Sequence, residues 1–133
     1  MTRYFADSFY YLALLNPRDE AHRRAAEFTR EIERPVVTTA WILTEVGDAL
    51  AAPQQRPAFV DLVDDLRVDP EVEIVPPTAD LFHRGIVLFR DRPDKHWSLT
   101  DCISFVVMRE RGLTDALTGD HHFEQGGFRA LLK

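Results

Sequence analysis

The chain has 133 residues, of which 45% are hydrophobic and 29% charged, with a formal net charge of −6 and one cysteine, Cys102. This length suits one hydrophobic core, and the composition excludes a disordered or fibrous chain, so we expect a single domain over residues 1–133. No disulfide within the chain is possible, and the N-terminal sequence MTRYFADSF lacks the features of a signal peptide, so we expect a cytoplasmic protein without membrane attachment.

The first half of the chain alternates between short apolar strands and helices. The segment RYFADSF opens with a β-prone run, after which Asp7 and Ser8 can cap a helix. The polar segment 18–33 is rich in helix formers, which predicts an exposed helix. A buried strand PVVTT at 35–39 and a helix over 40–52 are predicted next.

The second half continues this alternation, with prolines at the points where the pattern changes. Short strands separated by helices of 10 to 16 residues predict an α/β protein, a three-layer α/β/α sandwich with a short, mainly parallel sheet. The predicted elements are a helix over 57–69, a strand at 72–75, a helix over 78–91, a polar connection over 92–97, a helix over 101–111, the strand and turn DALTGD at 115–120, and a strand at 128–132.

Three aspartates are predicted to lie at one edge of this sheet. Asp7 follows the first strand, Asp120 follows the strand ALT, and Asp101 lies in the first turn of a helix. Ligands of parallel sheets bind outside the carboxyl ends of the strands, so these side chains are candidates for a common site. The overall negative charge argues against nucleic-acid binding through a basic surface, but an acidic cluster loaded with divalent cations is locally positive.

Glu45 is a fourth candidate because of its position on the helix 40–52. At about 100° per residue, it lies about 40° from Trp41, inside the apolar arc that includes Ile42 and Val46. A carboxylate facing a core needs a cation, a metal ion or an escape to solvent. The alternative interpretation is that Glu45 lies at the margin of the arc and is partly solvated.

Each aspartate also has a purely structural interpretation. Asp7 and Asp101 could cap helices or lie in first turns, and Asp120 could be a turn residue beside Gly119. The coincidence of four such acids is better explained by a site for one or two Mg²⁺ or Mn²⁺ ions, which take oxygen ligands. Two such ions about 4 Å apart can catalyse hydrolysis of a phosphodiester.

Other polar residues near these acids suggest weaker hypotheses. His121 and His122 are not expected to bind zinc, because adjacent residues point in different directions and no spaced partner completes a site; packing or phosphate contact is predicted instead. The connection FRDRPDKHW is either an RNA-phosphate contact or a solvated loop. Its Trp97 could stack on a base.

Four segments in this order, FADSF, TTAWILTEVGDAL, SLTDCISFVVM and ALTGDHHF, make the chain resemble PIN-domain proteins, particularly toxin ribonucleases of the VapC type. The resemblance implies a parallel sheet between helices, an RNA-cleaving Mg²⁺ or Mn²⁺ site, a homodimer, and inhibition by a small antitoxin that inserts a basic or aromatic segment into the acidic cleft. Gly119 departs from the family, which often has a second threonine there. By the same resemblance the acids are Asp7, Glu45, Asp101 and Asp120, and Ser8, Thr100 and Thr118 occupy hydroxyl positions that support them or contact substrate.

Other classes of protein are less consistent with these residues. An aspartyl phosphatase would need an acid at position 9, which is Phe9, and the glycine loops that bind nucleotides are missing. The remaining alternative is a non-catalytic PIN-like binding module whose acidic cleft grips the arginines of a partner.

Overall fold

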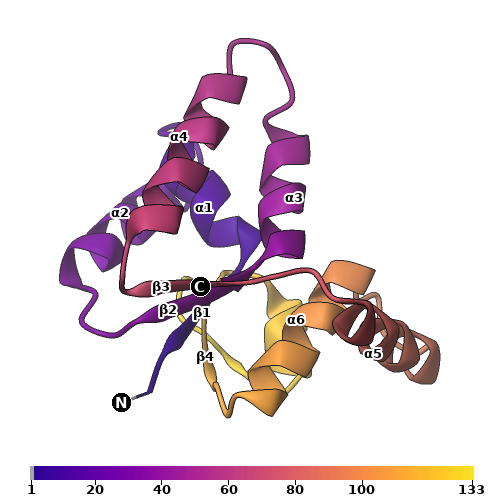
Figure 1. The fold of residues 1–133 in the computed structure, drawn as a ribbon. Coiled ribbons are helices and arrows are strands. Elements are labelled where there is room, and N and C mark those ends of the chain that lie inside the picture. The colour runs from indigo at the N-terminus through magenta and orange to yellow at the C-terminus, as the bar shows by residue number, and fades with distance from the viewer. Residues whose placement is uncertain (1) are drawn as a thin grey trace.

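The computed structural model describes residues 2–133 as a parallel five-stranded sheet between helices (Figure 1), which confirms the predicted α/β/α architecture. The strands are β1 (Tyr4–Ala6), β2 (Val36–Thr39), β3 (Val72–Val75), β4 (Asp115–Leu117) and β5 (Arg129–Ala130). The helices are α1 (Ser8–Leu15), α2 (His22–Glu31), α3 (Ala40–Ala49), α4 (Arg56–Val68), α5 (Ala79–Asp91), α6 (Leu99–Glu110) and α7 (His121–Gln125).

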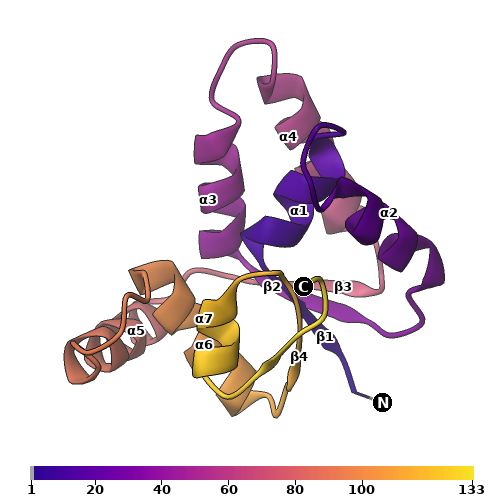
Figure 2. The ribbon, with the colours of Figure 1, turned by 180° about the vertical axis from the view of Figure 1, so that it is seen from behind.

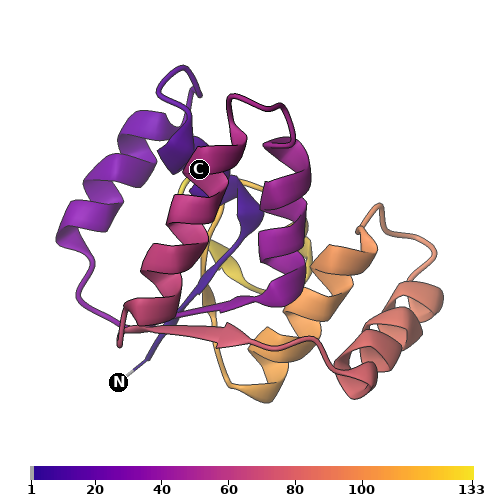
Figure 3. The same cartoon turned by 45° about the horizontal axis from the view of Figure 1, so that its top comes forward.

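The helices form two layers, one on each face of the sheet. Figures 1 and 2 show α1, α2, α3 and α4 on one face and α5, α6 and α7 on the other. Within the first layer, α3 and α4 run side by side and are joined by a loop at their far ends (Figure 3). None of the helices between residues 2 and 133 is long and apolar enough to cross a membrane.

The strand order is β3-β2-β1-β4-β5. The chain therefore adds β2 and β3 on one side of β1 and then β4 and β5 on the other side. The point where the direction changes lies between β1 and β4, which is where parallel sheets commonly bind ligands at their carboxyl ends. The register pairs Ala6 with Leu117. Asp7 and Thr118 therefore leave the sheet side by side.

The helix α6 forms the centre of its layer, as its nearly uninterrupted apolar sequence predicts. Phe105 is fully buried there, and its ring makes edge-on contacts with Trp97 at 4.9 Å and Phe123 at 5.0 Å between centroids. The indole of Trp97 also donates a hydrogen bond to Gln125. Trp97 is only 4% exposed, so it packs in the core and is not placed to stack on a base.

The helix boundaries differ from the predicted ones where side chains cap the backbone. The helix α2 begins at His22 because Asp19 closes a turn by accepting a hydrogen bond from the backbone of Ala21. The helix α6 begins two residues earlier than predicted because Ser98 and Asp101 form a reciprocal capping box. The short helix α7 was not predicted, and α3 ends at Ala49 before the predicted end at residue 52.

Candidate functional site

Asp7 lies at the carboxyl end of β1 and is almost completely buried, with 4% of its surface exposed. It occupies the N-cap position of α1, but its side chain makes no capping hydrogen bond. The carboxylate instead accepts a hydrogen bond of 2.7 Å from the hydroxyl of Thr118. The structural interpretation of Asp7 as a helix cap is therefore wrong, because its side chain points across to β4.

The hydroxyl of Thr118 connects two of the candidate acids. Besides donating to Asp7, its oxygen accepts a hydrogen bond of 3.0 Å from the backbone N–H of Asp120. Asp120 is the N-cap residue of α7, where one of its carboxylate oxygens accepts from the backbone of His122 at 2.9 Å. Thr118 is fully buried, so this connection fixes the position of both acids relative to the sheet.

Asp101 reaches the same region from the first turn of α6. One carboxylate oxygen accepts from the backbone N–H of Ser98, which completes the capping box. The same oxygen lies 3.3 Å from the Nδ1 atom of His122, and that nitrogen lies 3.4 Å from a carboxylate oxygen of Asp120. The structural interpretation of Asp101 is therefore correct in part, since its carboxylate both caps α6 and approaches Asp120 through His122.

Glu45 is half-buried and lies on the margin of the apolar side of α3. The buried side of this helix is formed by Ile42, Leu43 and Val46, whereas Ala49, which was predicted to belong to it, is exposed. The buried side of α3 is therefore rotated by part of a turn relative to the predicted apolar arc. Glu45 lies at its margin and is partly solvated, as the alternative interpretation expected. The hydroxyl of Ser8 donates a hydrogen bond to its carboxylate, which holds Glu45 against the start of α1.

The four carboxyl groups affect one another electrostatically. Burial raises the pKa of Asp7 to about 7 against the opposing effect of the Thr118 hydrogen bond, and the charges of Asp101 and Glu45 raise it further. Burial also raises the pKa of Glu45, with smaller contributions from Asp101 and Asp120. The pKa of Asp101 is raised by burial and then by Asp120, despite its hydrogen bonds to Ser98.

No lysine or arginine among residues 2–133 forms an ion pair with any of these four acids. Several carboxylates held close together without a basic side chain repel one another unless a cation lies between them. The donor atoms are carboxylate oxygens, which are the ligands that Mg²⁺ and Mn²⁺ prefer. The donor types of the four acids therefore suit a hard divalent metal ion, whereas the group of ligand atoms within 4.8 Å of one another among residues 2–133 is that of Asp120, His121 and His122.

The three hydroxyl residues implied by the resemblance differ in whether they form hydrogen bonds to the candidate acids. Ser8 and Thr118 hydrogen-bond to Glu45 and Asp7, as described. Thr100 lies within the first turn of α6, where it makes no side-chain hydrogen bond to any of residues 2–133, and Ser98 is the residue that caps this helix.

Gly119 is explained by the aromatic ring that faces it. A Cβ atom at this position would lie 2.5 Å from the Cζ atom of Phe9, closer than any real contact of this kind. The ring of Phe9 therefore occupies the space that a threonine side chain would need. Phe9 also stands where an aspartyl phosphatase would need an acid.

The sequence interpretation did not anticipate the position of His122. It is the second of the two histidines that follow Asp120 in the chain, and the structure places its ring between Asp120 and Asp101. The only signal in the sequence is the dipeptide HH after a candidate ligand.

The basic connection before α6 is partly neutralised, because Arg92 forms a two-point ion pair with Asp94 and Arg90 pairs with Asp91.

Comparison with known proteins agrees with this geometry. Residues 4–128 match the PIN domain family. The chain is 27% identical over 124 residues to the 23S rRNA-specific endonuclease VapC20 of Mycobacterium tuberculosis, covering 93% of this chain and 94% of the relative. The crystal structure of VapC20, described as a sarcin–ricin loop cleaving toxin, superposes with a TM-score of 0.85 at 26% identity over 94% of this chain and 95% of that one.

More distant structures share the fold. A toxin–antitoxin complex from Klebsiella pneumoniae superposes with a TM-score of 0.68 at 15% identity, covering 96% of this chain and 97% of that chain. The match to the family spans nearly every element described here, including the strand ends that carry the acids. The chain therefore belongs to the PIN-domain family.

Proposed function

We propose that this chain is a metal-dependent endoribonuclease and the toxin of a type II toxin–antitoxin pair. The observation that carries the proposal is the electrostatic influence of Asp7, Glu45, Asp101 and Asp120 on one another, from four separate elements and without a lysine or arginine to neutralise them. The similarity to an endonuclease that acts on 23S rRNA supports RNA as the substrate class.

The four acids would hold one or two Mg²⁺ or Mn²⁺ ions. When bound, such ions activate a water molecule and stabilise the negative charge that develops on a phosphodiester during hydrolysis. The other residues position the acids. Thr118 holds Asp7 and the backbone of Asp120, whereas Ser8 holds Glu45. These supporting hydrogen bonds fix the carboxylates before any ion or RNA arrives, which lowers the cost of assembling the site.

The alternative, a non-catalytic module that grips a partner's arginines, needs carboxylates that a partner can reach. Asp7 is 4% exposed and Asp101 is 9% exposed, so each presents little of its carboxylate to an arginine on the surface of another protein. A divalent ion is smaller than a guanidinium group and can keep part of its water shell on the exposed side of the site. The burial of the two acids therefore favours the nuclease.

The first experiment is to incubate untagged protein with RNA in the presence of Mn²⁺ and, separately, EDTA. A sarcin–ricin loop oligonucleotide is the first substrate, because the similar VapC20 is described as cleaving that loop. We expect cleavage only with Mn²⁺, leaving 5′-phosphate and 3′-hydroxyl ends that sequencing of the products will identify. Mg²⁺ should substitute for Mn²⁺.

Two variants control this experiment. Asp101→Asn should abolish cleavage, whereas Asp61→Asn should retain it, because Asp61 is an exposed residue of α4. Cleavage that survives in EDTA or in Asp101→Asn would contradict the proposal. A protein that neither cleaves any RNA of a broad panel nor binds Mn²⁺ in a calorimetric titration would favour the binding module.

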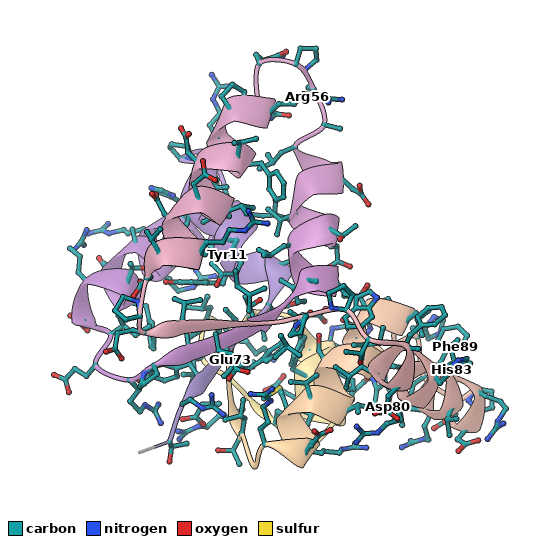
Figure 4. The ribbon with its side chains drawn as sticks, in the orientation of Figure 1. Tyr11, Arg56, Glu73, Asp80, His83 and Phe89 are labelled. Carbon is teal, nitrogen blue, oxygen red and sulfur yellow. The ribbon has the colours of Figure 1, made fainter. Side chains whose placement is uncertain are left out.

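The partners that we propose are a small antitoxin and a second copy of this chain. An apolar groove opens between α3 and α4, lined by Leu43, Phe59 and Val63, and it runs along the helix that carries Glu45. An antitoxin helix lying there could extend a basic or aromatic segment toward the acids. On the other face of the sheet, α5 exposes a row of apolar side chains one turn apart that suits self-association: Phe82, Ile86 and Phe89 (Figure 4 labels Phe89).

A further inference from the structure

Three neighbouring side chains at the start of α7 converge. One potential ligand atom from each of Asp120, His121 and His122 lies within 4.8 Å of the corresponding atoms of the other two. Side chains in a helix lean toward its N-terminal end, so rings on the first two residues of α7 tilt back toward the preceding Asp120. The prediction that adjacent histidines point apart is therefore wrong: their ring centroids are 4.4 Å apart.

The distances between these atoms resemble those between ligands of one metal ion. The Nδ1 atom of His122 lies 3.4 Å from a carboxylate oxygen of Asp120 and 3.3 Å from one of Asp101, and the Nδ1 atom of His121 lies 3.6 Å from Asp120. Zinc bonds to nitrogen and oxygen are about 2.0–2.1 Å long, so two ligands of a tetrahedral ion are about 3.3–3.4 Å apart. The observed separations are too long for good hydrogen bonds but match this spacing.

We propose that His121, His122 and Asp120 form a second metal site, which binds a divalent ion of borderline softness such as Zn²⁺, with Asp101 beside His122. Imidazole nitrogen is a preferred ligand of Zn²⁺ and a poor one for Mg²⁺, so this site differs in chemistry from the all-carboxylate site. It is open to solvent, because the side chain of His121 is 65% exposed and that of His122 is 21% exposed. The metal site itself stands on these three side chains alone.

Occupation of this site would regulate the nuclease, and this part of the inference rests on the proposed function. Two imidazoles and one carboxylate supply three ligands of a tetrahedral zinc ion and leave its fourth position to water. Asp120 would then be engaged and could no longer serve Mg²⁺ or Mn²⁺. Zn²⁺ is therefore expected to inhibit Mn²⁺-dependent cleavage, and removal of the histidines should relieve that inhibition.

Binding is tested first, without RNA. Isothermal titration of untagged protein with Zn²⁺ should show one site in the wild type, and its affinity should fall at least about tenfold in His122→Ala and in His121→Ala. His83→Ala is the matched control, because His83 is an exposed histidine on the outer side of α5, away from the site (Figure 4). Its affinity should equal that of the wild type. Thermal unfolding of each metal-free variant checks that it remains folded.

Spectroscopy identifies the ligands directly. In ¹⁵N-labelled protein, Zn²⁺ should shift the imidazole nitrogen resonances of His121 and His122, whereas Mg²⁺ at the same concentration should leave them in place. If His122 is only a positive group between two carboxylates, His122→Ala will bind Zn²⁺ as tightly as the wild type or more tightly. That result, or unshifted imidazole resonances, would overturn the proposal.

The two proposals fail separately. Histidine-dependent Zn²⁺ binding by a protein that cleaves no RNA would leave the metal site standing and reject the nuclease. Mn²⁺-dependent cleavage by a protein whose Zn²⁺ affinity does not depend on the histidines would do the reverse. Zinc inhibition of equal strength in the wild type and in His122→Ala would reject the regulatory role.

Discussion

Two aspartates are buried at opposite ends of the neighbouring strands β1 and β4, and the charges of the side chains around them differ. At the amino end of β4, Asp115 is 3% exposed and accepts hydrogen bonds of 2.9 Å from Arg34 and from two nitrogens of Arg129. At the carboxyl end of β1, Asp7 is 4% exposed and accepts a hydrogen bond from the hydroxyl of Thr118, with no lysine or arginine of residues 2–133 paired to it. The exposed fractions of the two side chains are therefore alike, whereas the charges of their neighbours are not.

This difference reverses the direction of the pKa shift. The hydrogen bonds from Arg129 and Arg34 lower the pKa of Asp115 despite its burial, whereas burial and nearby acids raise the pKa of Asp7 to about 7. An ionised Asp115 therefore stabilises the fold, and an ionised Asp7 destabilises it in the absence of a cation. Acids that destabilise their own fold are characteristic of functional sites, because a ligand can repay the cost.

The largest expected effect comes from Asp7→Asn. We expect Mn²⁺-dependent RNA cleavage to fall at least about 100-fold, because even residues that only support a metal ligand contribute 10- to 100-fold. In the same variant, the free energy of unfolding without metal should rise at pH 8 by about 1–3 kcal/mol, because a buried charge is removed. Cleavage assays and urea unfolding measure the two changes.

The combination of lost activity and gained stability distinguishes Asp7 from a structural residue. A variant that lost both activity and stability would show that Asp7 is needed for folding, and the contrast with Asp115 would disappear.

The next effect comes from Thr118→Val, which removes the hydroxyl that joins Asp7 and Asp120. The shape of the side chain is nearly kept, so we expect a modest loss of stability and a 10- to about 100-fold loss of cleavage. Thr38→Val is the matched control, because Thr38 is equally buried and its hydroxyl donates to the backbone of Ala6 at 2.9 Å and not to any of the four acids. Equal losses of cleavage in both variants would show that Thr118 has no special relation to the acids.

Asp115→Asn should have the opposite effect to Asp7→Asn. It leaves Arg34 and Arg129 without a charged partner, and we expect the free energy of unfolding to fall by about 1–2 kcal/mol. The value is at the low end for a buried ion pair because the side chain of Arg129 is 71% exposed. Below the melting temperature, the rate of RNA cleavage should be unchanged. A large loss of cleavage in the folded variant would show that the two ends of the sheet are coupled.

The last effect is the pH dependence of stability in the metal-free protein. The pKa of Asp7 is higher in the folded state than in the unfolded state, so the folded state binds more protons between about pH 4 and 7 and loses stability as the pH rises. The pKa of Asp115 is lowered, so its stabilisation is present above about pH 4 and is lost below it.

Urea unfolding from pH 4 to 8 checks these signs. The decline in stability between pH 5 and 8 should be smaller in Asp7→Asn than in the wild type by about 2–3 kcal/mol. Asp115→Asn should keep the wild-type decline above pH 5. A steeper decline in Asp7→Asn would mean that the ionised carboxylate stabilises the fold.

Local sequence patterns accounted for much of the fold. The hydrophobic periodicity predicted the strands, and proline positions and capping residues separated the helices from them. The boundary of α6 was misplaced because Ser98 and Asp101 form a mutual hydrogen-bonded cap that hydrophobic pattern alone does not reveal. The helix α7 was missed because it has five residues, fewer than such a pattern needs to be recognised.

The candidate acids were also found from the sequence, because Asp7 and Asp120 follow predicted strands and parallel strands bring their carboxyl ends to one edge of the sheet. The hydrogen-bond partners of these acids were not found from the sequence, since Thr118 lies 111 residues from Asp7. The same is true of the two histidines, whose rings turn toward Asp120 only because α7 begins there.

The sequence by itself determined which elements form and which oxygen-bearing side chains end them, because both depend on neighbours within a turn or a strand. Only the tertiary structure decided which acid is neutralised and which is not. Asp7 and Asp115 look alike in the sequence, each beside a short apolar strand. They differ because burial and charge are fixed by residues brought together from distant parts of the chain: two arginines at one end of the sheet, and further acids at the other.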